Sequence, residues 1–127
     1  IYFFGGGKHE VETLDNWVSQ IPNSENVAGK LSLKEELLKI AGLEIMISMD
    51  SANMHLASLV GTRCISVWGA THPYAGFLGY GQHEDDVIQV KDLTCRPCSV
   101  FGDKKCYRGD WACLHEINIQ QIMDKIQ

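Results

Sequence analysis

The segment DSANMH, residues 50–55, groups side chains that suit the binding of a phosphorylated ligand. It follows a short apolar run and opens a stretch of helical period, so a strand is expected to stop here and a helix to start. In an open parallel sheet this position is the carboxyl edge, where ligands bind, and the free N–H groups and dipole of a helix start favour an anion. His55 lies about one turn into the helix, so it can point back toward the same place and act on a proton there.

A structural interpretation of the same segment stays open. Asp50 or Ser51 would then cap the helix, and His55 would be an ordinary, partly buried imidazole. A catalytic Ser/His/Asp triad is not expected, because residues crowded into one helix start cannot line up as nucleophile, base and orienting group.

Four of the five cysteines are clustered. Cys64 stands alone, whereas the others fall within nineteen residues, at Cys95, Cys98, Cys106 and Cys113. Four thiolates on one loop can form a closed zinc site, for which His115 is an alternative ligand, but only the first pair has the close spacing of a zinc ribbon. Reduced, packed thiols and a pair of disulfides are the alternatives. We expect no metal at the site, no cofactor, and a fold that does not depend on disulfides.

Hydrophobic periodicity places these residues on an alternation of short strands and helices. Strands are expected at residues 2–4, 44–49, 64–68 and 87–90, and helices at residues 10–21, 33–41, 52–60 and about 116–127. Ser32 and Glu35 have the spacing of a capping box at the start of the second helix. The run at 44–49 is mostly apolar and should be a strand covered on both faces. Strand, helix and strand in close succession predict a parallel sheet, followed by a long functional loop at 69–84.

Length and charge limit the class of protein. The 127 residues are 45% hydrophobic, enough to bury one ordinary core but not two. Lys and Arg total 11 against 16 for Asp and Glu, and the formal charge of -5 has the wrong sign for binding nucleic acid or anionic lipid as a main task. No apolar run is long enough to span a membrane and no signal peptide opens the chain, so a soluble protein is expected. A chain that begins on a strand, without Met and with about four strands, is expected to be a piece of a larger protein.

Several segments together resemble one known family. The stretches DSANMHLASLVG and CISVWGATHP resemble the D-[ST]-G-x-x-H-L-x-x-A-x-G and V-x-L-[FY]-G-P-T-x-P patterns of the heptosyltransferases, glycosyltransferase family 9. GGGKHE, AGKLSLKEELLKIAGLEIMISMD and the Cys-rich CRPCSVFGDKKCYRGDWACLHEI resemble further segments of that family. Each motif alone is weak, but their order is the family's order and they cover most of the chain.

The resemblance implies a fold. Family members have two Rossmann-like domains that face each other across a cleft, the GT-B arrangement. The chain would be an α/β, Rossmann-like parallel sheet forming the incomplete C-terminal half of such an enzyme, with the first strand and its phosphate-contacting loop upstream of Ile1. Residues 1–127 would form a single nucleotide-sugar-binding domain, with a Cys-rich loop at 91–113 and a C-terminal helix at about 116–127.

The resemblance also implies an activity. The full-length enzyme would transfer heptose or a related sugar from an ADP-sugar donor, similar to ADP-heptose, to a lipopolysaccharide core acceptor. The acceptor would bind through the missing N-terminal domain. The location would be cytoplasmic, with peripheral membrane contact by the full-length protein, and the fragment alone would be inactive. The alternative is a non-catalytic nucleotide- or zinc-binding α/β module, which metal content and the upstream coding sequence would distinguish.

Carried over by position, the resemblance assigns roles around the nucleotide. Glu10 would bind the ribose hydroxyls, a role that suits two acceptor oxygens. Leu31 and Ser32 would lie by the adenine through backbone contacts. Solvation of Glu10 at a helix start and capping by Ser32 are the structural alternatives.

The same carry-over assigns the reacting end of the donor. Asp50 and His55 would be the catalytic pair: Asp50 accepts hydrogen bonds from sugar hydroxyls, and His55 holds or protonates the leaving phosphate. The remaining contacts to the donor would come from Ser51, Ala52, Asn53, Gly69 and Thr71. The sequence departs from the family pattern at Ala52, in place of Gly, and at Ala70, in place of Pro.

Overall fold

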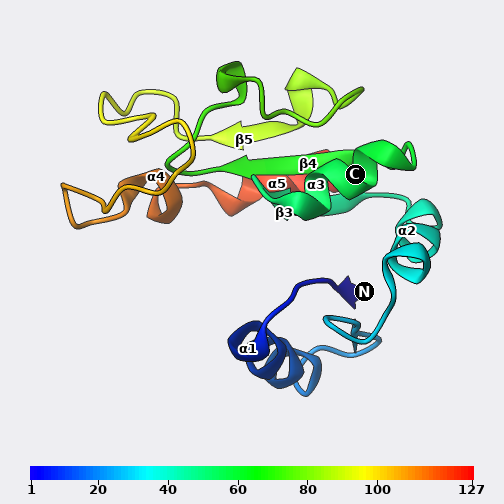
Figure 1. The fold of residues 1–127 in the computed structure, drawn as a ribbon. Coiled ribbons are helices and arrows are strands. Elements are labelled where there is room, and N and C mark those ends of the chain that lie inside the picture. Colours follow the sequence, from blue (N-terminus) through cyan, green and yellow to red (C-terminus); the bar gives the residue numbers. More distant parts are fainter. The chain divides into compact units, whose positions relative to one another are not determined.

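Strands and helices alternate along the chain in the computed structural model, which describes residues 1–127 (Figure 1). In chain order they are β1 (Tyr2–Phe3), α1 (Lys8–Val18), β2 (Glu25–Asn26), α2 (Leu33–Ala41), β3 (Met46–Met49), α3 (Ala52–Leu59), β4 (Cys64–Trp68), β5 (Val87–Gln89), α4 (Ala112–His115) and α5 (Ile119–Ile126). The chain divides into two units, residues 1–39 and 40–127. All expected strands and helices are present within a few residues of their expected bounds.

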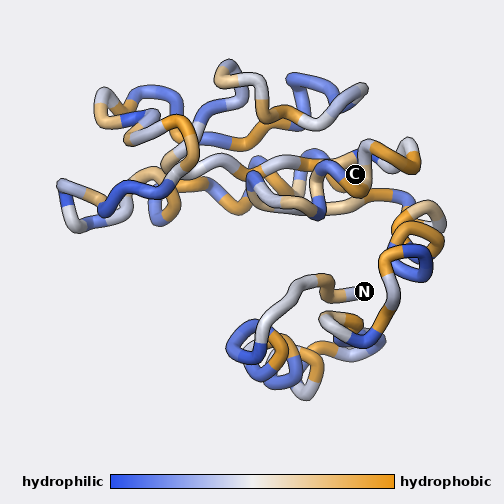
Figure 2. The backbone as a smooth tube through the Cα atoms, viewed as in Figure 1, coloured by the Kyte–Doolittle hydropathy of each residue, from blue (hydrophilic) through white to orange (hydrophobic).

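The unit of residues 1–39 is built on the parallel pair β1 and β2, which are connected by α1. Asn26, buried in β2, fixes the helix to the sheet, because its Nδ2 donates to Val11 O at 3.2 Å and to Asp15 Oδ1 at 2.7 Å. The sequence did not predict β2, since its two polar residues show no apolar alternation. In Figure 2, hydrophilic and hydrophobic residues alternate around the coils of α1 and α2, as expected of helices with one apolar face.

The capping box at the start of α2 is confirmed. The backbone N–H of Ser32 donates to Glu35 Oε2 at 2.8 Å, and the N–H of Glu35 reaches Ser32 Oγ at 3.4 Å. The Ser32 hydroxyl donates to Glu35 Oε2 at 2.6 Å, and this bond, followed by that from the Ser32 N–H, holds the pKa of the Glu35 carboxyl below its usual value. The reciprocal pair satisfies donors at the helix start that would otherwise be unpaired.

Residues 40–127 contain a three-stranded sheet in the order β3-β4-β5, with all strands parallel. All five residues of β4 are buried, as expected for the central strand of a parallel sheet. Ile65, Val67 and Ile88 form a core cluster, against which Ile117 and Ile122 pack. The C-terminal helix α5, which the sequence predicted, therefore lies close to the sheet, and β5 is an edge strand.

The prediction that β3 is covered on both faces was wrong. Met46 and Ser48 are buried, but Ile47 and Met49 are 48% and 47% exposed. The strand contacts α3 through one face, and β3 is an edge strand of this sheet. A short apolar run has the same composition whether one face is covered or two, so its sequence alone did not distinguish the cases.

None of the helices combines the length and the apolar character that crossing a membrane requires. The loop after β4 contains two short 3-10 helices, Pro73–Ala75 and Glu84–Asp86, and residues 91–111 contain no helix or strand.

The start of β5 is held to the start of β4 by a bidentate ion pair. Arg63 Nε donates to Asp86 Oδ2 at 2.8 Å and Arg63 Nη2 to Asp86 Oδ1 at 2.6 Å. Asp86 is only 5% exposed. The hydrogen bonds from Arg63 keep the pKa of the Asp86 carboxyl below its usual value, despite the opposing effect of burial.

We expect Asp86→Asn to destabilise the fold at neutral pH and to lose this effect in acid. The folded-state pKa of Asp86 is depressed, so the charge contributes stability above the unfolded pKa of about 4, and the contribution is lost as the pH falls through the lower, folded value. Urea unfolding of both proteins between pH 7 and pH 3 checks this. Asp85→Asn, which removes a neighbouring exposed carboxylate, is the control. A difference between wild type and Asp86→Asn that stays constant with pH would contradict the prediction.

Candidate functional site

The segment from Asp50 to His55 lies at the carboxyl edge of the sheet. Asp50 and Ser51 directly follow Met49, the last residue of β3, and α3 begins at Ala52. Since β3 pairs in parallel with β4, the ends of both strands point to the same edge. This placement of Asp50 and Ser51 was predicted from the sequence and is confirmed.

The start of α3 is free of side-chain caps. Ser51 occupies the N-cap position in an extended conformation, but its side chain makes no capping hydrogen bond. Its Oγ instead lies 3.0 Å from Ser48 Oγ. The structural interpretation, in which Asp50 or Ser51 caps the helix, is therefore wrong for this structure. The first N–H groups of α3 remain available to an anion, where the helix dipole favours one.

The side chains around this helix start are accessible to a ligand. Ala52 and His55 are exposed, whereas Asp50, Ser51 and Asn53 are half-buried. A carboxylate, a hydroxyl, an amide and an imidazole thus stand within six consecutive residues at one helix start. The group combines anion-binding N–H donors with an imidazole that can donate a hydrogen bond.

The loop after β4 forms the next part of the same edge. It contains Gly69, Ala70 and Thr71, and Thr71 is 8% exposed. A side-chain carbon added to Gly69 would stand 2.7 Å from Leu114 Cδ2, so a larger residue here would require the Leu114 side chain of α4 to shift. The structure brings Gly69 and Thr71 to the same sheet edge as Asp50 and Ser51, because β3 and β4 end side by side.

Glu10, Leu31 and Ser32 belong to the unit of residues 1–39. Glu10 is exposed in the first turn of α1, and its Oε2 accepts a hydrogen bond of 2.8 Å from the N–H of Gly6. Ser32 caps α2, as described above, and Leu31 beside it is half-buried. Glu10 and Ser32 thus make hydrogen bonds within their own segments of the chain. The contacts of Glu10, Leu31 and Ser32 with a nucleotide remain predictions.

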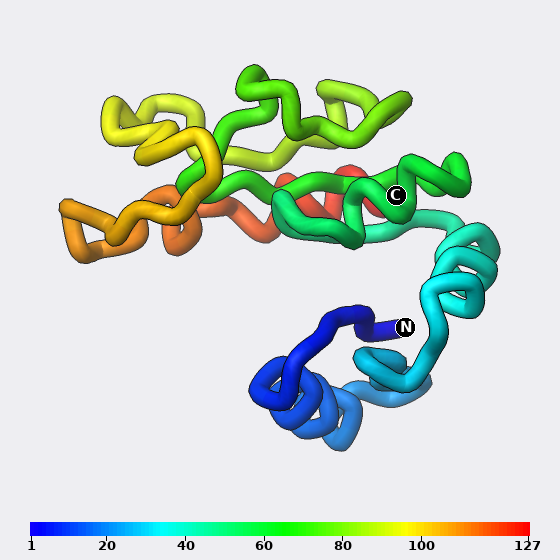
Figure 3. Tube along the Cα trace, viewed as in Figure 1, coloured from blue at the N-terminus to red at the C-terminus, as the bar shows by residue number.

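Arg96 is a residue of this edge that the sequence analysis missed. Its guanidinium donates to the backbone oxygens of Gly69 and Thr71, after β4, and of Val90, after β5. An arginine between two cysteines in an irregular segment shows no periodicity, so no sequence signal pointed to it. In Figure 3 the segment that carries it, coloured yellow to orange, runs beside the ends of β4 and β5.

The five cysteines are unpaired. Burial raises the pKa of the Cys64 thiol to about 11, and burial followed by the neighbouring thiol of Cys98 raises that of Cys113. The pKa of Cys106 is lowered, first by a hydrogen bond from the backbone of Trp111. No group of three or more His, Cys, Asp or Glu side chains is arranged to hold a metal ion. The loop therefore shows neither the disulfides nor the zinc geometry that the spacing left open.

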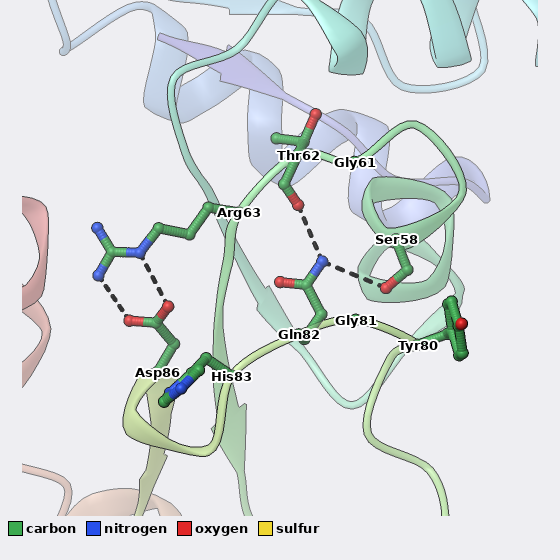
Figure 4. Close-up of a pocket in the computed structure, with 9 residues that line it drawn as sticks. All are labelled: Ser58, Gly61, Thr62, Arg63, Tyr80, Gly81, Gln82, His83 and Asp86. Carbon is green, nitrogen blue, oxygen red and sulfur yellow. Dashed lines mark hydrogen bonds and ion pairs between the residues drawn. The ribbon is translucent and has the colours of Figure 1, made fainter.

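A groove of about 560 Å³ lies at the other end of β4 (Figure 4). It is lined by Ser58, Gly61, Thr62, Arg63, Tyr80, Gly81, Gln82, His83 and Asp86. Its polar groups bind one another: Gln82 Nε2 donates to Ser58 Oγ and Thr62 O, and Arg63 pairs with Asp86. Because these donors and acceptors already bind one another, the groove has fewer free polar groups for a ligand than the uncapped start of α3 has.

Parallel strands flanked by helices, with an open helix start at the carboxyl edge, are the arrangement of nucleotide-binding α/β proteins. The model of the family "Glycosyltransferase family 9 (heptosyltransferase)" matches residues 1–118. The chain belongs to this family, and its sheets and helices form a Rossmann-like α/β fold.

Two curated relatives are each called "Lipooligosaccharide heptosyltransferase 2". The protein from Campylobacter jejuni subsp. jejuni serotype O:2 is 26% identical over 135 aligned positions, which cover 98% of this chain and 39% of the relative. The protein from serotype O:6 is 25% identical over 137 positions, covering 100% of this chain and 40% of the relative. The chain thus spans about two fifths of the length of these relatives. No solved structure gives a significant match.

Proposed function

We propose that the chain is the donor-binding part of a GT-B glycosyltransferase that transfers heptose or a related sugar from an ADP-sugar to a lipopolysaccharide core acceptor. The observation that carries the proposal is the uncapped start of α3 at the carboxyl edge, with Asp50 and His55 beside it. Family membership and the names of both relatives support a heptosyl transfer. The whole protein would work in the cytoplasm, contact the membrane peripherally, and bind the acceptor through another domain.

The roles of the site residues follow from charge. The N–H groups of Ala52 and Asn53, together with the Ser51 hydroxyl, hold the diphosphate, because the helix start stabilises negative charge. Asp50 accepts hydrogen bonds from sugar hydroxyls, since a carboxylate in contact with the diphosphate would be repelled. His55 donates a hydrogen bond or a proton to the departing phosphate, on which charge grows as the glycosidic bond breaks.

The outer parts of the donor have separate partners. Glu10 binds the ribose hydroxyls, and the backbone at Leu31 and Ser32 lies by the adenine. Gly69 and Thr71 complete the phosphate end. In this arrangement residues 1–127 act as one nucleotide-sugar-binding domain.

A transfer assay with the full-length gene product tests the proposal. The protein is incubated with ADP-heptose and a lipopolysaccharide core that lacks the outer heptose, and mass spectrometry follows both products. The expected result is an acceptor heavier by one heptose and one ADP released for each transfer. Absence of transfer, together with zinc bound in the purified protein, would support the non-catalytic module instead.

We expect residues 1–127 alone to bind ADP weakly and to transfer no sugar. The matched part of the relatives is about two fifths of their length, so the rest of the cleft is outside this segment. Calorimetric titration of the 127-residue chain with ADP should show no tight site, whereas the full-length protein should show one. Sub-micromolar binding by the short chain would mean that the donor contacts or the domain limits are misplaced.

A further inference from the structure

One arginine joins the two loops that leave the sheet at its carboxyl edge. Arg96 Nε donates to Gly69 O at 2.5 Å and Arg96 Nη2 to Thr71 O at 2.9 Å, both in the loop after β4. Arg96 Nη1 donates to Val90 O, just after β5, at 2.7 Å. Each guanidinium nitrogen thus has a different backbone oxygen as its acceptor. A planar group with fixed N–H directions sets the relative positions of the three carbonyls.

The neighbouring backbone completes this connection. The N–H of Cys98 donates to Ala70 O at 2.9 Å, so three successive carbonyls, those of Gly69, Ala70 and Thr71, are bound by residues 96–98. By contrast, the N–H groups of Ala70 and Thr71 donate to no other group in the chain. The carbonyl acceptors of this loop are therefore occupied, whereas two of its N–H donors are free. This combination favours binding of an anion over binding of a cation.

Arg96 does not itself serve as a free charge for a ligand. It is half-buried, and burial lowers the pKa of its guanidinium while the thiols of Cys113, Cys95 and Cys98 act in the opposite direction. Its three nitrogens already donate to protein oxygens, unlike the exposed Lys104 of the same segment, which makes no hydrogen bond. The geometry therefore gives Arg96 an effect through the loop rather than direct contact with a donor.

We propose that Arg96 is a positioning residue for the donor: it binds the carbonyls of the loop at 69–71 and so keeps the N–H groups of Ala70 and Thr71 directed to a phosphate of the nucleotide. The inference rests on the proposed function, because it concerns the same site. Loss of the guanidinium leaves Gly69, Thr71 and Val90 carbonyls without their donor, and the loop then samples other conformations before each binding event.

The test uses the full-length protein with Arg96→Gln, Arg96→Lys and the control Lys104→Gln, which removes a positive charge from the same segment. We expect Arg96→Gln to raise the donor KM and the Kd for ADP by about tenfold or more, with a smaller change in kcat at saturating donor. Arg96→Lys keeps the charge but loses the fork of donors, so it should resemble Arg96→Gln rather than the wild type. Lys104→Gln should match the wild type.

Hydrogen exchange gives a readout that does not depend on the donor. In Arg96→Gln and Arg96→Lys, the amide of Cys98, whose N–H donates to Ala70 O, should exchange faster than in the wild type, while the amides of β4 stay protected. Full restoration of ADP binding by Arg96→Lys would overturn the inference, because Arg96 would then act as a charge. If one of the two Arg96 variants does not fold, ADP binding and hydrogen exchange of the other variant still test the inference.

The two proposals fail in different ways. If the wild type binds no ADP and transfers no sugar, the proposed function is wrong and Arg96 positions no donor, whatever the exchange rates are. If the wild type binds ADP and Arg96→Gln binds it within twofold of the wild type, only the inference on Arg96 is wrong.

Discussion

Replacing Asp50 or His55 by alanine in the full-length protein should slow sugar transfer by roughly two to three orders of magnitude, on the order of 2.7–4 kcal/mol of transition-state stabilisation, by analogy with the loss of an oxyanion-hole donor. The analogy applies directly to His55, which would donate to the leaving diphosphate beside the uncapped start of α3. Asp50→Ala would instead remove the acceptor that orients the sugar hydroxyls for transfer. Steady-state kinetics on variants with unchanged thermal unfolding measures the effect. His55→Ala should lower kcat more than it raises the donor KM, because a proton is needed mainly in the transition state.

Cys98→Ser is the matched control for this experiment. The contact of residue 98 with the site is its backbone N–H, which donates to Ala70 O and is retained by serine. The substitution should therefore change stability more than transfer. If Asp50→Ala and His55→Ala stayed near wild type while Cys98→Ser abolished transfer, the chemistry would lie in the Cys-rich loop and the site assignment would have to be dropped.

Local signals in the sequence predicted what local physics determines. Ser32 and Glu35 cap α2 as their spacing indicated, because a capping box depends on residues three positions apart. Asp50 and Ser51 lie at the carboxyl edge, because a strand that leads directly into a helix between parallel strands must end there. The order of elements and the parallel sheet followed from the same alternation.

Features that depend on distant partners were not predictable. Nothing local shows that Ile47 and Met49 are left exposed, because the covering of a strand face is decided by other elements. The side chain of Arg96 binds oxygens as many as 27 residues away in sequence, so its neighbours give no hint of the contact. Ser51 has a residue type that commonly caps helices, yet its hydroxyl lies against Ser48 instead.

The indole of Trp68 lies in the larger unit, at the end of β4 and next to the loop that Arg96 holds. Its side chain is fully buried, and its Nε1 donates to the buried Ser66 Oγ at 2.9 Å. Removing the ring leaves a large cavity and takes away the hydrogen-bond donor of a hydroxyl that water cannot reach.

We therefore expect Trp68→Ala to lower the free energy of unfolding by about 3–5 kcal/mol, the range found for large aromatic residues replaced by alanine in cores. Urea unfolding followed by circular dichroism measures the change. Trp111→Ala is the comparison, because Trp111 is in the same unit but 45% exposed, and its loss should cost clearly less. Trp68→Phe should lower the free energy of unfolding by an amount between those of the two alanine variants. The phenyl ring refills part of the volume but leaves Ser66 without its hydrogen-bond donor. Equal destabilisation by Trp68→Ala and Trp111→Ala would show that the core of residues 40–127 is not centred on β4.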